Sequence, residues 1–414
     1  MSKMTLPSDA NASGRSFGPE ELELLKQVLD SGTLNCTKGT TVVRFEKRFA
    51  EFIGAPFCRC TTSGTAAVHA AVAAVNPEPG DEIVTTSITD MGAISPILYQ
   101  TAIPVFADTD PHTYNVTADT IRRKLTRRTR AVIVTHLFGN PCEMDPIVDL
   151  CKSKGLVLIE DAAQAYGTTY RGRHVGTFGQ IGCFSLQQGK HMTTGEGGMV
   201  VSGDAELSRR MQLFIDKAWG YGDPKPDHYF LAMNYRMTEL AGAVALAQME
   251  KLPRMVDRRI EMAEALTALI RDVHGVHAPT IRPGSQHTYW KYPLRVDPRA
   301  IRGGADAIGQ KLRDRGVFCA PRYIQKPAFE CEVLRDRNTF GKSHFPYEGE
   351  HRKGEPPVVY DIADTPGTAE GLATVVVLPW NEKYTKEHVD YIAQAIRQAS
   401  AELTSGAETG GKKS

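Results

Sequence analysis

The sequence predicts an α/β protein in which a largely parallel sheet is covered by crossover helices and followed by a smaller α+β unit. From about Phe57 to Val201, short apolar or β-branched runs alternate with turns and helical stretches. The runs are mostly apolar, without a regular alternation of polar residues, which is typical of strands buried on both faces. The chain has 414 residues, too many for one hydrophobic core, so one large and one modest domain are expected.

The candidate elements follow in chain order. Strands are predicted at Glu82 to Thr86, Ile103 to Ala107, Arg130 to Thr135, Gly155 to Glu160, Gly182 to Ser185 and Gly198 to Ser202. Next come a helix from Glu239 to Leu252, a break at Pro253, and a second helix from Val256 to Asp272. The smaller unit is predicted to hold strand-like runs at Tyr289 to Val296 and Val317 to Ala320, and helices from Asp306 to Arg315 and Lys386 to Leu403.

These elements divide the chain into an N-terminal arm (1–20), a large domain (21–255), a small C-terminal domain (256–402) and a disordered tail (403–414). Between about Asp336 and Thr368 lies a stretch rich in proline, glycine and charge, with little periodicity. It is interpreted either as a covering loop or as a plain surface insertion.

Composition excludes several classes of protein. The 49 basic and 48 acidic residues give a net charge of +1, so neither a nucleic acid nor a membrane is expected as a partner. The eight cysteines form no CxxC pair and lie near no spaced histidine pair, so neither a disulfide framework nor a metal site is predicted. The N-terminal residues contain no apolar core of signal-peptide type, and no run of about 18 apolar residues occurs. A cytoplasmic location is therefore expected.

Three segments carry candidate chemistry. The first, TTSGT at 61–65, turns from a short strand into the helix AAVHAAVAAV, which is apolar nearly all round and is therefore expected to be buried. A buried helix N-terminus offers free N–H groups, hydroxyls and a positive dipole end, which suit a phosphate. An ordinary N-cap, with Gly64 allowing close packing, is the alternative interpretation.

The second segment, LVLIEDAAQ at 156–164, is an apolar strand that ends in two carboxylates. Ligands of open α/β sheets bind beyond the carboxyl ends of the strands, so Asp161 is placed to hold a cationic group such as a pyridinium nitrogen. Capping of the next helix is the alternative role for Asp161.

The third segment, GCFSLQQGKHMTTGEGG at 182–198, places Ser185 at a strand end, Lys190 five residues later, and then a glycine-rich turn. A lysine in such a place can have a lowered pKa and serve as an amine nucleophile or Schiff-base former, and the alternative interpretation is an exposed loop lysine. Together the three segments supply anion donors, a carboxylate for a ring nitrogen and a lysine for an aldehyde. These are the parts that a pyridoxal phosphate site needs.

The chain also resembles a known family, the sugar aminotransferases of the DegT/StrS type. That family has the pyridoxal phosphate (PLP)-dependent transferase fold of type I, the fold of aspartate aminotransferase. The resemblance runs from about Leu22 to Ala399 and is carried by TTSGTAAVHAAV, IEDAAQAYG, GCFSLQQGKHMTTGEGGMVVS and NYRMTELAGAVALAQMEKL, among other segments. The IEDAAQ and K-to-GEGG stretches are the most specific of these.

By this resemblance the cofactor is pyridoxal 5'-phosphate, Lys190 forms the internal aldimine, and Asp161 pairs with the pyridinium nitrogen; these two are the expected catalytic residues. Gln164 is expected beside the phenolic oxygen of the ring. The phosphate is expected to be held by Gly64, Thr65 and Ser185, joined by Asn234 of a second subunit. The resemblance therefore implies a homodimer with shared active sites.

One position departs from the family pattern. The segment after the Gly-Asp-Glu turn usually carries an aromatic residue that stacks on the cofactor ring, and here Asp90 occupies that position. The residue that covers the ring is therefore open, with Met91 or a residue from elsewhere in the chain as candidates.

The implied reaction is a ping-pong transfer of an amino group from Glu or Gln to a keto sugar, nucleotide-linked or free, or to a cyclitol ketone. A PLP-dependent sugar dehydratase is one alternative, but that branch replaces the lysine by histidine, and here His191 follows one position too late. A non-catalytic PLP-binding regulator is another, and it leaves the retention of Lys190, Asp161 and Ser185 unexplained. Candidates in the small domain for facing the acceptor, or simply for packing, are His287, Tyr289, Trp290, Arg322 and Tyr323.

Overall fold

The computed structural model describes residues 3–404 of the chain. The predicted disordered tail, 403–414, is wrong for its first two residues, because the last helix, α12 (Lys386–Thr404), includes both. The rest of that predicted tail lies outside the described residues.

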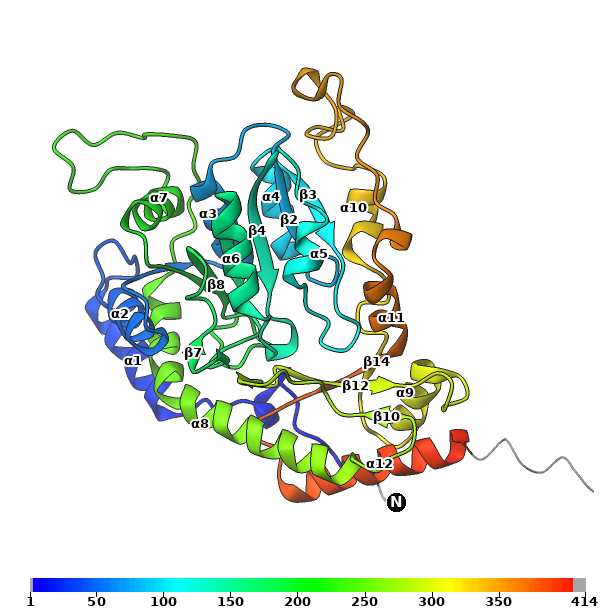
Figure 1. Cartoon of the computed structure of the whole chain (residues 1–414). Coiled ribbons are helices and arrows are strands. Elements are labelled where there is room, and N and C mark those ends of the chain that lie inside the picture. The colour runs from blue at the N-terminus through cyan, green and yellow to red at the C-terminus, as the bar shows by residue number, and fades with distance from the viewer. Residues whose placement is uncertain (1–2, 405–414) are drawn as a thin grey trace, which may run out of the picture.

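A seven-stranded sheet forms the centre of the larger unit (Figure 1), in the order β1-β9-β8-β5-β4-β2-β3. Its strands are β1 (Phe57–Thr61), β2 (Glu82–Thr86), β3 (Ile103–Ala107), β4 (Thr129–Thr135), β5 (Val157–Asp161), β8 (Ile181–Ser185) and β9 (Gly198–Ser202). The pairs from β3 to β8 are parallel, and β9 is antiparallel to both of its neighbours. The prediction of a largely parallel sheet is confirmed.

Helices cover both faces of this sheet. On one face α3 (Gly64–Val75) and α7 (Ala205–Ile215) pack on a cluster that includes Ile133 and Ile159. On the other face lie α2 (Thr41–Ile53), α6 (Met144–Lys154) and α8 (Glu239–Ile270), where residues such as Leu158 point. Because successive strand residues face opposite ways, β5 directs Ile159 and Asp161 to the α3 side, and Leu158 and Glu160 to the α6 side.

The smaller unit is a four-stranded antiparallel sheet, β10-β12-β14-β13, backed by helices. It consists of β10 (Val276–His277), β12 (Lys291–Val296), β13 (Ala320–Pro321), β14 (Val375–Pro379), α9 (Gly304–Asp314) and α12. Its core, with Tyr292 and Trp380 at its centre, is separate from the clusters of the large sheet. On these two cores we propose the division into a large domain, 21–255, and a small domain, 256–402.

The predicted helix break at Pro253 is wrong. Helix α8 runs unbroken from Glu239 to Ile270 and passes Pro253, joining α1 (Pro19–Ser31) and α2 at one end to α12 at the other (Figure 1). Proline removes one helical hydrogen bond. Leu252 and Met255 are buried on either side of it in the core beneath the large sheet, so tertiary packing holds the helix together across the proline.

The segment rich in proline and glycine covers the edge strand β3. It contains η5 (Glu350–Arg352), η6 (Ile362–Asp364) and the start of α11 (Pro366–Thr374), and it follows directly on η4 (Ala328–Glu330) and α10 (Glu332–Arg335), which cover the same edge. Phe106 of β3 packs against Phe329 and Tyr360 at ring-centroid distances of 5.4 and 5.1 Å, and the Tyr360 hydroxyl donates to the Pro104 carbonyl at 2.7 Å. Between the two predicted alternatives, a covering loop is correct, and what it covers is an otherwise unpaired sheet edge.

The remaining described elements are short: η1 (Ala12–Gly14), η2 (Met91–Ala93), η3 (Leu137–Gly139), α4 (Ser95–Tyr99), α5 (Ala118–Arg122), and a small sheet of β6 (Thr169–Tyr170), β7 (Arg173–His174) and β11 (Ser285–Gln286). Within residues 3–404, no helix is long and apolar enough to cross a membrane. Over the same residues, no group of three or more metal-ligating side chains is close enough to hold a metal ion.

Candidate active site

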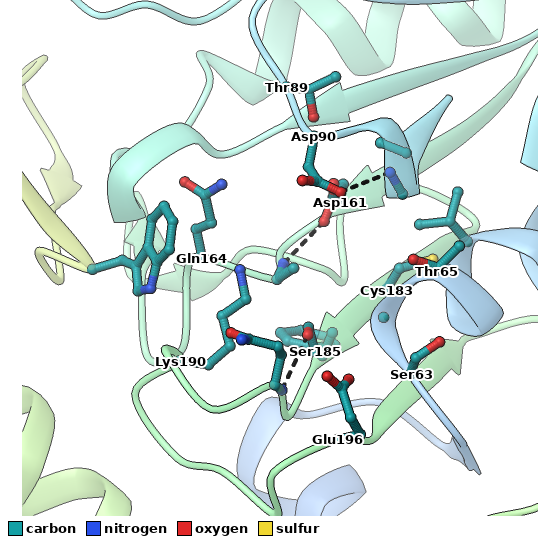
Figure 2. A pocket seen from close by; sticks show the side chains of 18 of the residues that line it. Ser63, Thr65, Thr89, Asp90, Asp161, Gln164, Cys183, Ser185, Lys190 and Glu196 are labelled. Carbon is teal, nitrogen blue, oxygen red and sulfur yellow. Dashed lines mark hydrogen bonds between the residues drawn. The ribbon is translucent and has the colours of Figure 1, made fainter. Parts of the chain in front are cut away.

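A cavity of about 450 Å³ lies where β5 and β8 end and α3 begins (Figure 2). Six of the seven residues predicted from the sequence line it, namely Gly64, Thr65, Asp161, Gln164, Ser185 and Lys190. The seventh, Asn234, lies elsewhere and is exposed. The structure thus brings together three segments that are about 100 and 25 residues apart in the chain, as expected when strand ends share one edge of a sheet.

One end of the cavity is built to receive an anion. Ser63 caps α3, its hydroxyl accepting a hydrogen bond from the Ala66 N–H at 3.0 Å. The amides of Gly64 and Thr65 belong to the first helical turn, where no carbonyl lies one turn back to accept from them. A Cβ built on Gly64 would come within 2.7 Å of the Ser185 Cβ, so glycine is required for the end of β8 to approach the helix this closely.

The two carboxylates at the end of β5 have different tasks. Glu160 is fully buried on the α6 side and accepts hydrogen bonds from Gly176 N and Gly179 N, both at 2.7 Å, and lies 3.0 Å from His136 Nε2. Asp161 points into the cavity and uses one oxygen to accept from Ala163 N at 3.1 Å. Burial raises the pKa of Asp161, and the Ala163 amide and the positive charge of Lys190 partly offset this. The carboxylate that the cavity presents is therefore Asp161.

Lys190 extends into the cavity from a loop that follows β8. Its Nζ lies 4.3 Å from the centroid of the Trp290 ring, and Figure 2 shows the Lys190 side chain extending into the cavity that Asp161 and Gln164 also line. Loss of hydration lowers the pKa of the Lys190 amine, against the opposing effect of the nearby carboxylates, Asp161 first among them. A lowered pKa increases the fraction of free amine near neutral pH, which is the nucleophilic form.

Gln164 is held by the chain that follows β4. Its Oε1 accepts from the Phe138 N–H at 2.8 Å, so its amide nitrogen is the donor on the side of Tyr323 and the cavity. Phe138 has a positive φ of 61° and packs edge-to-face against Tyr323 at 4.9 Å. Gln164 and Tyr323 therefore line the same wall of the cavity, from two units of the fold.

Asp90, in the position where an aromatic residue was expected, does line the cavity. Its Oδ1 accepts from Gly92 N at 2.7 Å and caps the short helix η2. Met91, one candidate for covering a ring, packs instead against the core under β3. The aromatic side chains that line the cavity are Phe184, Trp290 and Tyr323.

The small-domain candidates divide into two groups. Trp290 and Tyr323 line the cavity, whereas His287 and Tyr289 are buried and stacked on each other at 4.0 Å, which is a packing role. Arg322 is not among the lining residues. Sequence reasoning missed Ser63, Thr89 and Glu196 as lining residues, although the first and last stand inside segments that it singled out.

Asn234 lies on the chain between α7 and α8, which carries several exposed apolar side chains. Leu231 is 94% exposed, and Tyr221, Tyr229 and Met233 are also exposed. Asn234 itself is exposed and pairs with Asp216 in an isolated bridge. An exposed apolar segment of this kind is typical of a surface that meets another protein.

A model of the DegT/DnrJ/EryC1/StrS aminotransferase family matches residues 16–397. The chain belongs to this family. It is 37% identical over 276 residues to GDP-perosamine synthase of Escherichia coli O157:H7, covering 66% of this chain and 74% of that protein. It is 32% identical over 314 residues to L-glutamine:2-deoxy-scyllo-inosose aminotransferase of Streptomyces fradiae, covering 73% and 74%. Among solved structures, the aminotransferase TlmJ from Streptoalloteichus hindustanus superposes with a TM-score of 0.81 at 29% identity, covering 95% of this chain and 99% of that one.

The DegT/DnrJ/EryC1/StrS proteins are PLP-dependent transaminases of fold type I, so this chain is a PLP-dependent aminotransferase. The cavity fits the cofactor by three independent features. The α3 N-terminus with the Gly64 cradle suits its phosphate, Asp161 presents a buried carboxylate for its ring nitrogen, and Lys190 presents an amine for its aldehyde.

Proposed function

We propose that this protein transfers an amino group from Glu or Gln to the ketone of a sugar, nucleotide-linked or free, or of a cyclitol, in a ping-pong reaction. The observation that carries the proposal is the placement of Lys190, whose amine enters one cavity together with the Asp161 carboxylate and the N-terminus of α3. Bound PLP supplies an electron sink for the electron pair that remains when a proton leaves the Cα of the donor.

Each residue has a task in this proposal. Lys190 holds the aldehyde carbon of the cofactor and, once released by the donor, carries the proton from Cα, for which its lowered pKa is suited. Asp161 holds the ring nitrogen in its protonated form. Gln164 directs an amide N–H to the ring oxygen, because its Oε1 is already occupied by Phe138 N. The Gly64 and Thr65 amides, with the Ser185 hydroxyl, hold the phosphate.

We further propose a homodimer in which Asn234 completes the phosphate site of the other subunit. Asn234 is exposed and stands next to Met233, which is 46% exposed, in a segment that does not reach the cavity of its own chain. Burial of this apolar segment against a second copy would stabilise the association. The predicted cytoplasmic location stays a prediction.

The dehydratase alternative is not supported by the position of His191. Its side chain is fully buried away from the cavity and its Nε2 lies 3.0 Å from the Thr288 carbonyl oxygen, so it does not stand in for Lys190. The acceptor is proposed as a class, because the relatives include one named for a GDP-linked amino sugar and one named for a cyclitol ketone.

A half-reaction screen tests the proposal. The protein is loaded with pyridoxamine phosphate and mixed separately with a nucleotide-linked keto sugar, a free keto sugar and a cyclitol ketone, and the return of the aldehyde absorbance is followed. At least one ketone should restore it, and Glu or Gln should then remove it. Lys190→Ala is the matched control, because it keeps the cavity and loses the proton carrier. Failure of all three ketones would refute the acceptor class, and failure of both Glu and Gln would refute the donor.

A further inference from the structure

In the loop that carries Lys190, three successive backbone carbonyls need hydrogen-bond donors from outside the loop. Residues 188–190 form a turn and a bend rather than part of a strand, so their carbonyls find no partners in a sheet ladder. All three carbonyls instead accept hydrogen bonds from side chains that belong to other parts of the chain. Arg15 donates to Gln188 O and, through Nη1 at 2.8 Å, to Lys190 O, and Trp290 Nε1 donates to Gly189 O at 2.6 Å.

Arg15 is itself held in place. It is 5% exposed, and its Nε donates to Asp9 O at 3.1 Å. Gln188 Nε2 donates to the same carbonyl at 2.9 Å, so the arm and the lysine loop are bonded in both directions. Asn381 of the small domain donates to Gly14 O at 3.0 Å. An arginine suits this site because its planar guanidinium donates from two nitrogens at once, to the carbonyls of Gln188 and Lys190. The single ammonium of a lysine lacks this fixed two-pronged geometry.

Trp290 fixes the other end of the lysine. Its indole N–H binds the loop at Gly189, while the face of the same ring lies 4.3 Å from Lys190 Nζ. The Nζ of Lys291 lies 5.0 Å from the centroid of that ring. The backbone of Lys190 is thus held by the N-terminal arm, and its amine is placed by Trp290 of the small domain.

We propose that Arg15 and Trp290 are positioning residues that fix the direction from which Lys190 enters the cavity. The proposal rests on the proposed function, because it concerns the lysine that would hold the cofactor and carry the proton. It makes the N-terminal arm part of the active-site structure, although Arg15 lies 175 residues from Lys190 in the chain and does not line the cavity. Loss of the arm contact would free the loop, and misplacement of a reacting group by about 1 Å costs on the order of 100-fold in rate.

Hydrogen exchange of the protein without cofactor tests this proposal directly. In Arg15→Met, the peptide that spans 186–191 should exchange at least tenfold faster than in the unchanged protein, since its amides bond within the same loop, as Lys190 N does to Gln187 O at 2.9 Å. In Arg15→Lys the same peptide should exchange at a rate between those of the unchanged protein and Arg15→Met. Arg15→Lys also provides the test if Arg15→Met fails to fold. Trp290→Phe, which keeps a ring and loses the N–H, should loosen the same peptide.

Lys251→Met is the matched control. Lys251 donates to Ser16 O at 2.9 Å and to Glu21, so this change loosens the arm next to Arg15 while leaving both of the Arg15 bonds to the loop in place. The exchange of 186–191 should remain within about twofold of the original rate.

A kinetic split supplies the second readout. Arg15→Lys should lower kcat of the Glu half-reaction about tenfold or more with little change in KM, because donor-binding groups are untouched. Unchanged exchange at 186–191 in both Arg15 variants, or equal loosening by Lys251→Met, would overturn the positioning role. Absence of any transamination in the unchanged protein would instead refute the proposed function and leave the exchange result standing.

Discussion

Replacement of Asp161 by asparagine tests the electrostatic basis of the site. The side chain is 8% exposed, and one of its oxygens already accepts from Ala163 N at 3.1 Å, which leaves the other oxygen to face the cavity. Asparagine keeps the size and, with its oxygen toward Ala163, the backbone contact. It removes the negative charge and turns a donor rather than an acceptor toward the ring nitrogen.

The expected magnitude follows from the burial of this group. A charge-assisted hydrogen bond in a site largely withdrawn from water contributes about 2 to 4 kcal/mol, between the values for hydrogen bonds to charged groups and for broken buried ion pairs. If that bond stabilises the transition state for removal of the Cα proton, its loss slows the reaction roughly 30- to 1000-fold. The phosphate end of the cavity is unchanged, so the variant should still bind cofactor.

The assay is a single-turnover reaction of the PLP-loaded variant with Glu, followed by absorbance, with cofactor binding measured separately by titration. Glu160→Gln is the matched control, because its carboxylate lies next in sequence but on the other face of β5, where it holds Gly176 and Gly179. Glu160→Gln should lower the melting temperature of the protein. The rate of the single-turnover reaction of the folded variant should remain within a few-fold of the rate of the unchanged protein. An unchanged rate for Asp161→Asn would refute the assignment of Asp161 to the ring nitrogen.

Four further outcomes are expected. Borohydride reduction of the PLP-loaded protein should attach the cofactor to the peptide that contains Lys190, and mass spectrometry that finds it on another lysine would contradict the central assignment. Asn234→Ala should weaken cofactor retention without lowering the melting temperature of the cofactor-free protein, whereas an active monomer at assay dilution would argue against a shared site. Gly64→Ala should weaken PLP binding at least tenfold, while Gly203→Ala, where an added Cβ meets nothing within 4 Å, should not. Burial raises the pKa of Glu46 to about 7, so the folded state binds this proton more tightly than the unfolded state does. The free energy of unfolding therefore falls as the pH rises from about 4.5 to 7. Glu46→Gln should remove up to about 3 kcal/mol of that fall, as measured by denaturant unfolding at pH 5 and pH 8.

Local pattern was enough to predict most strands to within one or two residues, and the deviations have identifiable backbone causes. The strand predicted from Gly155 begins at Val157 because Gly155 ends α6 in the left-handed conformation, with a φ of 64°. The strand predicted from Tyr289 begins at Lys291, after a residue with a φ of 50°. Single-residue conformations of this kind depend on contacts that the sequence does not display.

For the candidate site too, the sequence predicted residues in locally recognisable positions but not the contacts between distant segments. Gly64 and Asp161 were identified because each stands at the start of a helix or the end of a strand, and Lys190 because it follows the end of β8 in a glycine-rich loop, so local sequence already indicated where they lie. Trp290 reaches the cavity through the docking of a second unit, and Arg15 reaches the lysine loop through an arm that precedes the first long helix. No periodicity or motif in the sequence predicts the contacts of Trp290 and Arg15, because both contacts form between segments that meet only in the folded chain.

The charges of the cavity provide an independent reason to expect a second subunit. Asp90, Asp161 and Glu196 face it, and Lys190 alone among the described lining residues carries a positive charge. A Glu donor brings two carboxylates and one ammonium, a net charge of −1 that adds to the three acidic side chains of the lining. A cation from outside this lining would offset that excess of negative charge. The segment before α8 carries Asn234 and, two residues later, Arg236, which pairs with Asp216 of its own chain. A partner that brings this segment to the cavity would supply the amide together with a cation that Asp216 partly balances. The excess of acidic side chains in the lining and the proposed role of Asn234 at the phosphate thus favour the same proposed dimer.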